Sequence, residues 1–391
     1  MKQPIYAAIF FFSILTVTCS QPSVEVSADF DHGSIGELEQ VEPGYFRGST
    51  EHWMKRDSIG DQYYWFYFRA DNVENRSVTF KLNNLSGIYR GNPHLVYTNY
   101  TRPVYSYDQE NWQRISNVQY DSSAQSFTFS HSFTQEPVWI AYAHPFPYSR
   151  YNKLISRLKD SDHVTVEQIA ESPEGRPIQL VSITNQEAPV EEKQTVLVIA
   201  LQHAGEDAGG YLVEGMIEYL LSGNPDAADA RSNFVYHIVP MMNPDGIYNG
   251  TSRYNSNMED LNSIWLDESL TQPEVAGVKE WVRQKQDNGN QLSLFIDVHN
   301  HTQKNRRNVF IFQNPELDVF VHNMQKYWPV EGGRSSFGGS SRTWFYQQNI
   351  PSGTLELTQS RVGDSEYLTI EDYYHYGEGM VKGISEYFGL E

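Results

Sequence analysis

The residues from Thr195 to Leu221 read TVLVIALQHAGEDAGGYLVEGMIEYLL, and the interpretation of the whole chain starts from this stretch. The apolar run 195–201 predicts a buried strand, and the apolar face of 209–221 predicts a helix soon after it. His203 and Glu206 lie between these two segments, at the end of a strand, where α/β proteins bind ligands. Two such side chains, three residues apart, can reach one metal ion, although a solvated turn could carry the same residues.

Apolar strands and amphipathic helices continue to alternate as far as the C-terminus. This alternation predicts a mostly parallel mixed sheet with helices on both faces. In such a fold, ligands bind beyond the carboxyl ends of the strands. The expected strands are 179–183, 195–201, 234–239, 294–298 and 354–357, and the expected helices are 151–159, 209–221, one that Pro273 opens, and a last one capped by Thr369 and Asp372.

The chain before this α/β pattern consists of short runs rich in aromatic and β-branched residues. The runs at 63–68, 77–82, 126–133 and 138–143 are separated by turn residues and predict an antiparallel β-sandwich. Trp112 and Trp139 could line a sugar-binding surface or, as is more common, fill the sandwich core. We therefore expect a β-sandwich domain at 24–146 and an α/β catalytic domain at 147–391, joined at a hinge-like segment, His144–Tyr148.

Length and charge limit the classes of function. A chain of 391 residues exceeds the usual size of a single core, so two domains are expected. Apolar residues make up 39% and charged residues 20%, a balance that favours a folded protein over a disordered one. The formal net charge of −20 argues against nucleic acid or an anionic membrane surface as a partner, while a local cationic pocket stays possible.

The N-terminus resembles an export signal at residues 1–19. Lys2 precedes an uncharged apolar stretch, Ile5 to Thr18, and the only cysteine of the chain, Cys19, follows it. Lipidation of Cys19 would anchor the protein to a membrane, and removal of the signal would release it by secretion. The sequence thus predicts a protein of the bacterial periplasm or cell surface, either lipid-anchored or secreted.

A third candidate ligand lies at another strand end. His299 follows the apolar run 294–298, so we expect it at the same edge of the sheet as His203 and Glu206. Two histidines and a glutamate are a ligand set of hydrolytic zinc enzymes, and the sequence therefore predicts one zinc ion with a position left for water. Glu356 lies in the apolar strand 354–357, and the cost of placing a carboxylate there favours a role as the catalytic base.

Further motifs surround these residues. In chain order they are AYAHPF (141–146), EGRP (174–177), HAGE (203–206), NPDG (243–246) followed by Arg253, DLN (260–262), DVH (297–299) and TLE (354–356). From about residue 145 to the C-terminus, the chain resembles the zinc metallocarboxypeptidases of the carboxypeptidase A superfamily. With the aromatic β domain in front, it is most similar to the cytosolic carboxypeptidase branch.

The resemblance implies a role for each matching residue at the centre. His203, Glu206 and His299 would hold the zinc ion. Glu356 would activate a water molecule and then pass its proton to the leaving amine. Arg253 would stabilise the negative charge that develops on the oxyanion in the transition state.

The substrate-binding side departs from the family pattern. Asp260 would orient the ring of His203, and Asn262 would contact the terminal carboxylate of the substrate. Where the family has an arginine that grips this carboxylate, the chain has Ser263, which offers one neutral hydrogen bond. Arg342 falls in the stretch that lines the pocket for the terminal side chain in relatives. It could favour Glu or Asp, take over the carboxylate, or lie solvated on its Gly/Ser-rich loop.

These features favour an exported zinc carboxypeptidase that acts on the C-terminus of peptides or proteins, with acidic terminal residues as one option. An amidase acting on cell-wall peptides or N-acyl amino acids is an alternative, which Ser263 and the export signal favour. A further alternative is an exported protein that binds glycans or proteins and uses the hydrolase domain as a scaffold. The intact ligand set and Glu356 argue against that scaffold.

Overall fold

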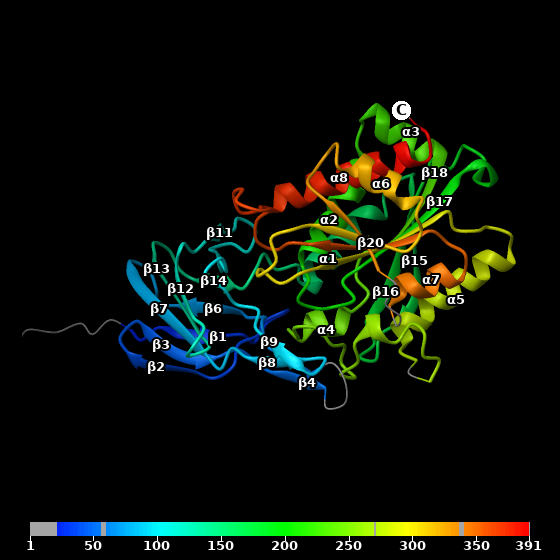
Figure 1. Ribbon diagram of the computed structural model, residues 1–391. Coiled ribbons are helices and arrows are strands. Elements are labelled where there is room, and N and C mark those ends of the chain that lie inside the picture. The colour runs from blue at the N-terminus through cyan, green and yellow to red at the C-terminus, as the bar shows by residue number, and fades with distance from the viewer. Residues whose placement is uncertain (1–21, 56–59, 270, 336–339, 391) are drawn as a thin grey trace, which may run out of the picture.

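The computed structural model of the chain describes residues 22–55, 60–269, 271–335 and 340–390 (Figure 1). The expected export signal at 1–19, with Cys19, lies outside these residues. Figure 1 shows a strand-rich N-terminal part beside an α/β part that is built around one large sheet. Among the helices in the described ranges, none combines the length and the apolar character required to cross a lipid bilayer.

Short strands in three sheets make up the N-terminal part. They are β1 (Glu25–Ser27), β2 (Leu38–Glu42), β3 (Tyr45–Ser49), β4 (Trp53–Lys55), β5 (Gly60–Gln62), β6 (Tyr67–Asp71), β7 (Arg76–Asn83), β8 (Gly87–Tyr89), β9 (Asn92–His94), β10 (Val104–Ser106), β11 (Gln113–Arg114), β12 (Asn117–Asp121), β13 (Ser126–Phe133) and β14 (Val138–Ala141). Within the described residues, the sheet orders are β1-β6-β14-β10-β11, β12-β13-β7-β3-β2 and β4-β5-β8-β9.

Aromatic rings fill the space between the two five-stranded sheets. The ring centre of Phe80 on β7 lies 5.0 Å from that of Phe68 on β6 and 5.3 Å from that of Phe129 on β13. Trp112 and Trp139 pack against the same core with part of their surface exposed. The predicted antiparallel sandwich is thus confirmed, with one departure, because β3 and β7 pair in parallel.

The α/β part contains the elements that the alternating pattern predicts, together with several that it does not. Its strands are β15 (Val164–Glu171), β16 (Pro177–Ile183), β17 (Gln194–Ala200), β18 (Phe234–Val239), β19 (Leu294–Asn300), β20 (Val309–Phe312), β21 (Glu331–Arg334) and β22 (Ser352–Leu357). Its α-helices are α1 (Tyr148–Leu158), α2 (Ala208–Leu221), α3 (Pro225–Asn233), α4 (Pro244–Tyr248), α5 (Pro273–Asp287), α6 (Leu317–Met324), α7 (Ser341–Gln347) and α8 (Ile370–Tyr387), with 3₁₀ turns at Val190–Glu192 and Leu261–Ser263.

The large sheet has the order β15-β16-β18-β17-β19-β22-β20-β21. Its centre is parallel, since β17 pairs in parallel with β18 and β19, and β19 pairs in parallel with β22. Antiparallel pairs join β15 to β16, β16 to β18 and β20 to β22. The predicted mostly parallel mixed sheet is therefore confirmed.

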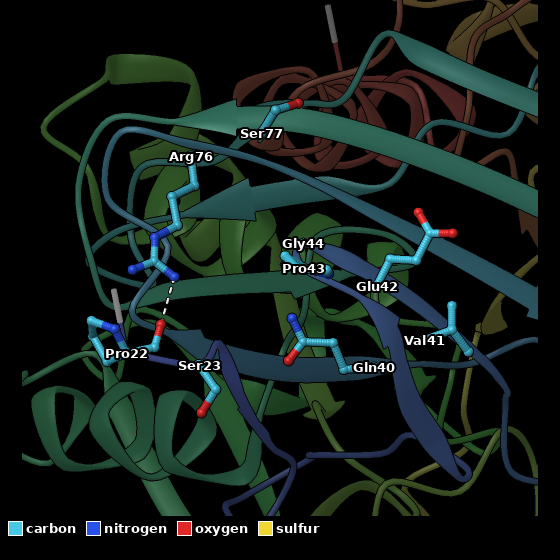
Figure 2. Close-up of a pocket in the computed structure, with 9 residues that line it drawn as sticks. All are labelled: Pro22, Ser23, Gln40, Val41, Glu42, Pro43, Gly44, Arg76 and Ser77. Atoms are coloured by element: carbon cyan, nitrogen blue, oxygen red, sulfur yellow. Dashed lines mark hydrogen bonds between the residues drawn. The ribbon is translucent and has the colours of Figure 1, made fainter. Parts of the chain in front are cut away.

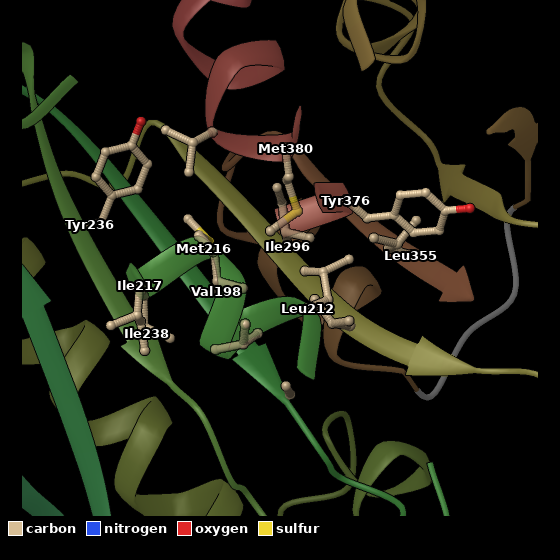
Figure 3. Packing of buried hydrophobic residues seen from close by; sticks show 14 of the residues in the cluster. Val198, Leu212, Met216, Ile217, Tyr236, Ile238, Ile296, Leu355, Tyr376 and Met380 are labelled. Carbon is tan, nitrogen blue, oxygen red and sulfur yellow. The ribbon is translucent and has the colours of Figure 1, made fainter. Parts of the chain in front are cut away.

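Side chains that alternate along β17 supply two separate cores. Val196 and Val198 belong to a cluster that includes residues of α2 and α8, and Figure 3 shows Val198 among them. Leu197 and Ile199 belong to a second cluster, on the opposite face, that includes residues of α5 and α7. Both faces of the central strands are therefore covered by helices, and this explains why 195–201 reads as a continuous apolar run.

One expected strand is corrected. The run 63–68 forms a strand only from Tyr67 onward, although Tyr63–Phe66 is buried. Two groups of this run bond to the α/β part instead of to a neighbouring strand: the hydroxyl of Tyr64 donates to the carbonyl of Ser252 (2.8 Å), and the backbone N–H of Trp65 donates to the Ser252 hydroxyl (3.2 Å). Residues 63–66 therefore contribute to the contact between the N-terminal part and the α/β part.

Glycines allow α2 and α8 to approach closely. A Cβ atom at Gly377 on α8 would lie 2.3 Å from the carbonyl oxygen of Leu212 and 2.5 Å from the backbone nitrogen of Met216. A Cβ atom at Gly215 on α2 would lie 2.4 Å from the Cα atom of Tyr374. These are backbone atoms, so a larger residue would force the two helices apart.

We expect Gly377→Ala to lower the free energy of unfolding by about 1–3 kcal/mol, the usual cost of overpacking. Gly223→Ala is the matched control, because a Cβ atom there would meet nothing within 4 Å, and its effect should stay within about 0.5 kcal/mol. Denaturant unfolding of both variants measures the difference. Equal stabilities would contradict the close packing of α2 on α8.

Candidate metal centre and active-site pocket

The central parallel strands bring the candidate ligands to one edge of the sheet. His203 and Glu206 lie in the turn after β17, and His299 lies near the end of the neighbouring strand β19. Leu201, which precedes this turn, is buried and adopts a φ of 60°, a left-handed conformation that is uncommon for residues other than glycine. Such a bend is held only where packing fixes it, and it turns the chain directly before the ligands.

Three ligand atoms converge in this buried cluster. One atom each of His203, Glu206 and His299 lies within 4.8 Å of the other two. Nδ1 of His203 lies 2.7 Å from Oε1 of Glu206, Nδ1 of His299 lies 2.7 Å from Oε2, and the two Nδ1 atoms are 3.1 Å apart. Burial alone would raise the pKa of Glu206, but the two histidines hold it well below its usual range. The set therefore offers two nitrogen ligands and one ionised carboxylate, which fits a zinc ion.

The opposite nitrogens of the two rings face carboxylates. Nε2 of His203 lies 3.1 Å from Oδ1 of Asp260, and Nε2 of His299 lies 2.9 Å from Oδ2 of Asp297. A carboxylate at Nε2 favours a proton on that atom, which leaves Nδ1 free to bind a metal. The position of the ligand atoms and the position of the two carboxylates therefore both indicate that the metal binds at the Nδ1 atoms.

Asp297 is a member of the site to which the sequence interpretation gave no role. It lies two residues before His299 on β19, so both side chains leave the strand on the same face. Its Oδ2 also accepts hydrogen bonds from Gln202 (2.7 Å) and from the hydroxyl of Ser341. The spacing Asp-x-His at a strand end was the signal that could have identified it.

Asp260 holds Arg253 as well as His203. Nε of Arg253 donates to Oδ2 of Asp260 at 2.7 Å, and both side chains are largely buried. Burial opposes each charge, yet each partner favours the ionised form of the other, so the pKa of Arg253 is raised and that of Asp260 is lowered. The arginine is thereby fixed beside the metal cluster with its charge retained.

Asn262 and Ser263 have local partners. Nδ2 of Asn262 lies 3.1 Å from Nε2 of His299, and its Oδ1 accepts from the backbone N–H of Ser341 (3.1 Å). The hydroxyl of Ser263 donates to the carbonyl of Asp260 at 2.9 Å. The expected contact of Asn262 with a substrate carboxylate stays a prediction, and the proton of Ser263 is already used within the protein.

A pocket of about 230 Å³ opens beside this cluster. Glu356 is half-buried in its wall, on β22, in register with His299 on β19. Arg342, near the start of α7, is only 4% exposed, so the alternative of a solvated arginine is wrong. The described residues that line the pocket are Arg90, Arg253, Asp260, Asn262, Ser263, Ile311, Ser340, Arg342, Thr354 and Glu356.

A larger recess, of about 810 Å³, lies on the N-terminal sandwich (Figure 2). There Nη1 of Arg76 donates to the carbonyl of Pro22 at 2.7 Å. Among the described lining residues, Arg76 and Glu42 are the only charged side chains. The recess therefore has no group of metal ligands, and the hydrolytic chemistry belongs to the smaller pocket.

Comparison with known families agrees with both parts of the chain. Residues 151–305 match the family model described as zinc carboxypeptidase, and residues 26–143 match the model described as cytosolic carboxypeptidase N-terminal domain. Cytosolic carboxypeptidase 6 of Mus musculus is 30% identical over 322 residues, which is 77% of this chain and 57% of that protein. The Homo sapiens protein of the same name is 29% identical, over 86% of this chain and 69% of its own length. The chain thus spans little more than half of the mouse relative.

Solved structures share the fold. A metallo-carboxypeptidase from Burkholderia cenocepacia has a TM-score of 0.82 at 21% identity, covering 94% of this chain and 99% of its own. A metallo-carboxypeptidase from Pseudomonas aeruginosa has a TM-score of 0.76 at 23% identity, covering 93% and 98%. They confirm the predicted fold class. The match to the zinc carboxypeptidase model and the His-Glu-His cluster confirm the single zinc ion as cofactor.

The expectation of an exported protein is wrong. The curated relatives are named cytosolic carboxypeptidases, and so is the N-terminal family model, which contradicts a signal peptide, a lipoprotein, secretion and a location in the periplasm or at the cell surface. A lipid anchor at Cys19 is not supported either. The expectation depended on Lys2, one short apolar stretch and Cys19, and such a local pattern does not by itself specify where a protein is sent.

We expect Asp297→Asn to lower zinc affinity by about 10- to 100-fold, because the amide no longer favours the tautomer of His299 that presents Nδ1. Metal content after dialysis against a graded series of chelator concentrations measures the effect. Asp229→Asn, an exposed residue on α3, is the control and should retain zinc like the unaltered protein. Equal retention by both variants would exclude the assigned role of Asp297.

Proposed function

We propose that the chain is a zinc carboxypeptidase that removes C-terminal amino acids from peptides or proteins, because residues 151–305 match the zinc carboxypeptidase family model and the mouse relative, 30% identical, is named a cytosolic carboxypeptidase. The observation that carries this proposal is the pocket in which Glu356 and Arg253 lie beside the buried cluster of His203, Glu206 and His299. Zinc, when bound, supplies a Lewis acid that activates water and polarises the carbonyl of the scissile bond.

Glu356 is the proposed proton carrier. It is half-buried at the pocket wall, and its Oε2 lies 3.7 Å from Nδ1 of His301, outside hydrogen-bond range. The carboxylate is therefore available to accept a proton from the attacking water and to deliver it to the leaving amine. Its register with His299 keeps it next to the metal ligands.

Arg253 is the proposed stabiliser of developing charge. Its Nε is held by Asp260, so the guanidinium keeps further N–H groups for a substrate oxygen. A fixed cation stabilises the oxygen of the scissile carbonyl as it gains negative charge, and no reorganisation is needed at that moment. This role was expected from the family resemblance, and the anchoring by Asp260 supports it.

Arg342 supports a preference for acidic terminal residues. The side chain is buried in the pocket wall, where burial lowers its pKa, and Nη1 donates a long hydrogen bond of 3.4 Å to the carbonyl of Ile311. Its Nε has no hydrogen-bond partner among the described residues. A terminal Glu or Asp side chain would supply the missing acceptor and a countercharge.

The alternatives are less well supported. An amidase acting on cell-wall peptides or N-acyl amino acids was favoured by Ser263 and by the export signal, and only Ser263 remains after the correction of the location. A binding protein with an inactive site has no need for the buried ligand cluster or for Glu356 in the pocket beside it. Hydrolysis at a peptide C-terminus accounts for the ligand cluster and for Glu356 beside it.

Replacing the proposed base separates chemistry from metal binding. We expect Glu356→Gln to reduce kcat by about 100-fold or more, because the amide cannot accept the proton of the attacking water. Zinc content should not change, since Glu356 is not a ligand. Release of amino acids from a peptide, together with metal analysis, tests both points, and an active Glu356→Gln variant would contradict the assignment.

Specificity is tested with matched peptides that end in Glu, Lys or Phe. We expect the highest kcat/KM for Glu, and a loss of about 10- to 100-fold for that peptide in Arg342→Ala, the size expected for hydrogen bonds to a charged group. Arg334→Ala, at an exposed position on β21, is the control and should change none of the three rates. Equal rates on all peptides, unaltered by Arg342→Ala, would reject the preference while leaving peptidase activity in place.

A further inference from the structure

We propose that Arg90, at the tip of the β8–β9 hairpin in the N-terminal part, binds the terminal α-carboxylate of the substrate. It would thereby replace the arginine that the family pattern has where this chain has Ser263. The inference rests on the proposed peptidase function and deepens it. It assigns a substrate-binding residue to a segment outside the zinc carboxypeptidase match, since residues 26–143 belong to the N-terminal family model.

The pocket requires a cation for this role. A carboxypeptidase substrate brings a carboxylate to the pocket, and the protein as a whole carries a net charge of −20, so binding depends on local positive groups. The hydroxyl of Ser263 donates to the carbonyl of Asp260, and a neutral hydroxyl supplies no positive charge for a carboxylate. Asn262 is bonded to the backbone of Ser341 through its oxygen, and its amide nitrogen faces His299.

Two of the arginines that line the pocket already have another task. Arg253 is paired with Asp260 next to the metal cluster, where charge develops during the reaction. Arg342 is buried at 4% exposure, which suits it to a side chain that enters the pocket. Arg90 is exposed, lines the same pocket, and makes no ion pair within the described part of the chain. Its guanidinium is thus free to bind a carboxylate bidentately.

The hairpin presents Arg90 on a defined turn. Tyr89 and Asn92 are paired across β8 and β9, and the two residues between them, Arg90 and Gly91, have φ values of 50° and 77°. Two consecutive left-handed residues are typical of the tight two-residue turn that suits the twist of a hairpin. The side-chain amide of Asn92 also donates to the carbonyl of Arg90 at 3.1 Å.

Tyr89 links the hairpin to the catalytic residues. Its ring centre lies 5.4 Å from Cζ of Arg90 and 5.6 Å from Cζ of Arg253, within the range of cation–π attraction. The aromatic ring therefore contacts both guanidinium groups. This arrangement positions Arg90 relative to the group that stabilises the scissile carbonyl.

Hydrogen bonds fix the hairpin's sheet on the α/β part. The hydroxyl of Tyr254, which follows Arg253, donates to the carbonyl of Gly60 on β5 at 2.6 Å. Within the N-terminal part, the hydroxyl of Tyr63 donates to the carbonyl of His94 at the end of β9 at 2.5 Å, which holds the hairpin in place. The sheet β4-β5-β8-β9 is thus tied to the segment that carries Arg253, and the N-terminal part completes the substrate pocket.

The test compares Arg90→Ala and Arg90→Lys with Arg47→Ala, which replaces an exposed arginine on β3, in another sheet of the N-terminal part. Each zinc-loaded variant is assayed on one peptide with a free C-terminal carboxylate and on its C-terminal amide, and cleavage of the last peptide bond is measured. For the free acid, we expect Arg90→Ala to raise KM by about 10- to 100-fold with kcat nearly unchanged. Arg90→Lys should lose less, and Arg47→Ala should match the unaltered protein.

The amide substrate identifies the group that Arg90 binds. Arg90→Ala should have little effect on the amide, so the preference for the acid over the amide should collapse in that variant. Ser263→Arg introduced into Arg90→Ala should bring the raised KM part of the way back down, because it returns a cation to the same pocket. An equal effect on acid and amide, or a KM equal to that of Arg47→Ala, would overturn the proposal. Absence of cleavage by the unaltered protein would instead reject the proposed peptidase function.

Discussion

The parallel pairing of β17, β19 and β22 is the constraint on which the site depends. It places His299 in register with Glu356, next to the turn that carries His203 and Glu206. Because side chains alternate along a strand, a slip of one residue would turn His299 to the opposite face of the sheet. The apolar layers that helices cover on both faces specify this register. The core and the metal site therefore have the same physical origin.

Carboxylates that bridge separate segments stabilise the charges of the site. Asp260 contacts His203 and Arg253, and Asp297 contacts His299 and the start of α7 through Ser341. Buried charges are tolerated only with such partners. Arginines line the pocket although the chain as a whole has a strongly negative net charge. The two observations agree, because the electrostatic field inside the pocket is determined by the nearest charged groups.

Elements with a strong local signal were predicted well. Ser126–Phe133 and Phe234–Val239 have the expected bounds, and Thr369 and Asp372 form the expected capping box before α8. The short helices α6 and α7 and the strands of the smaller N-terminal sheet were missed, because such elements depend on tertiary packing more than on propensity. Tyr63–Phe66 is the opposite case, because its sequence predicts a strand and the segment instead packs against the α/β part.

By itself, the sequence determined the fold class, the cluster that fits zinc and the candidate base, because these follow from short spacings and from the ends of apolar strands. Asp297 was within reach of the same reasoning through its spacing from His299. The tertiary structure alone decided that Arg342 is buried and that Arg90 lines the pocket. No local periodicity relates a hairpin tip to a loop far along the chain, so only the packing of the N-terminal sheet on the segment of Arg253 brings Arg90 and Ser263 into one pocket.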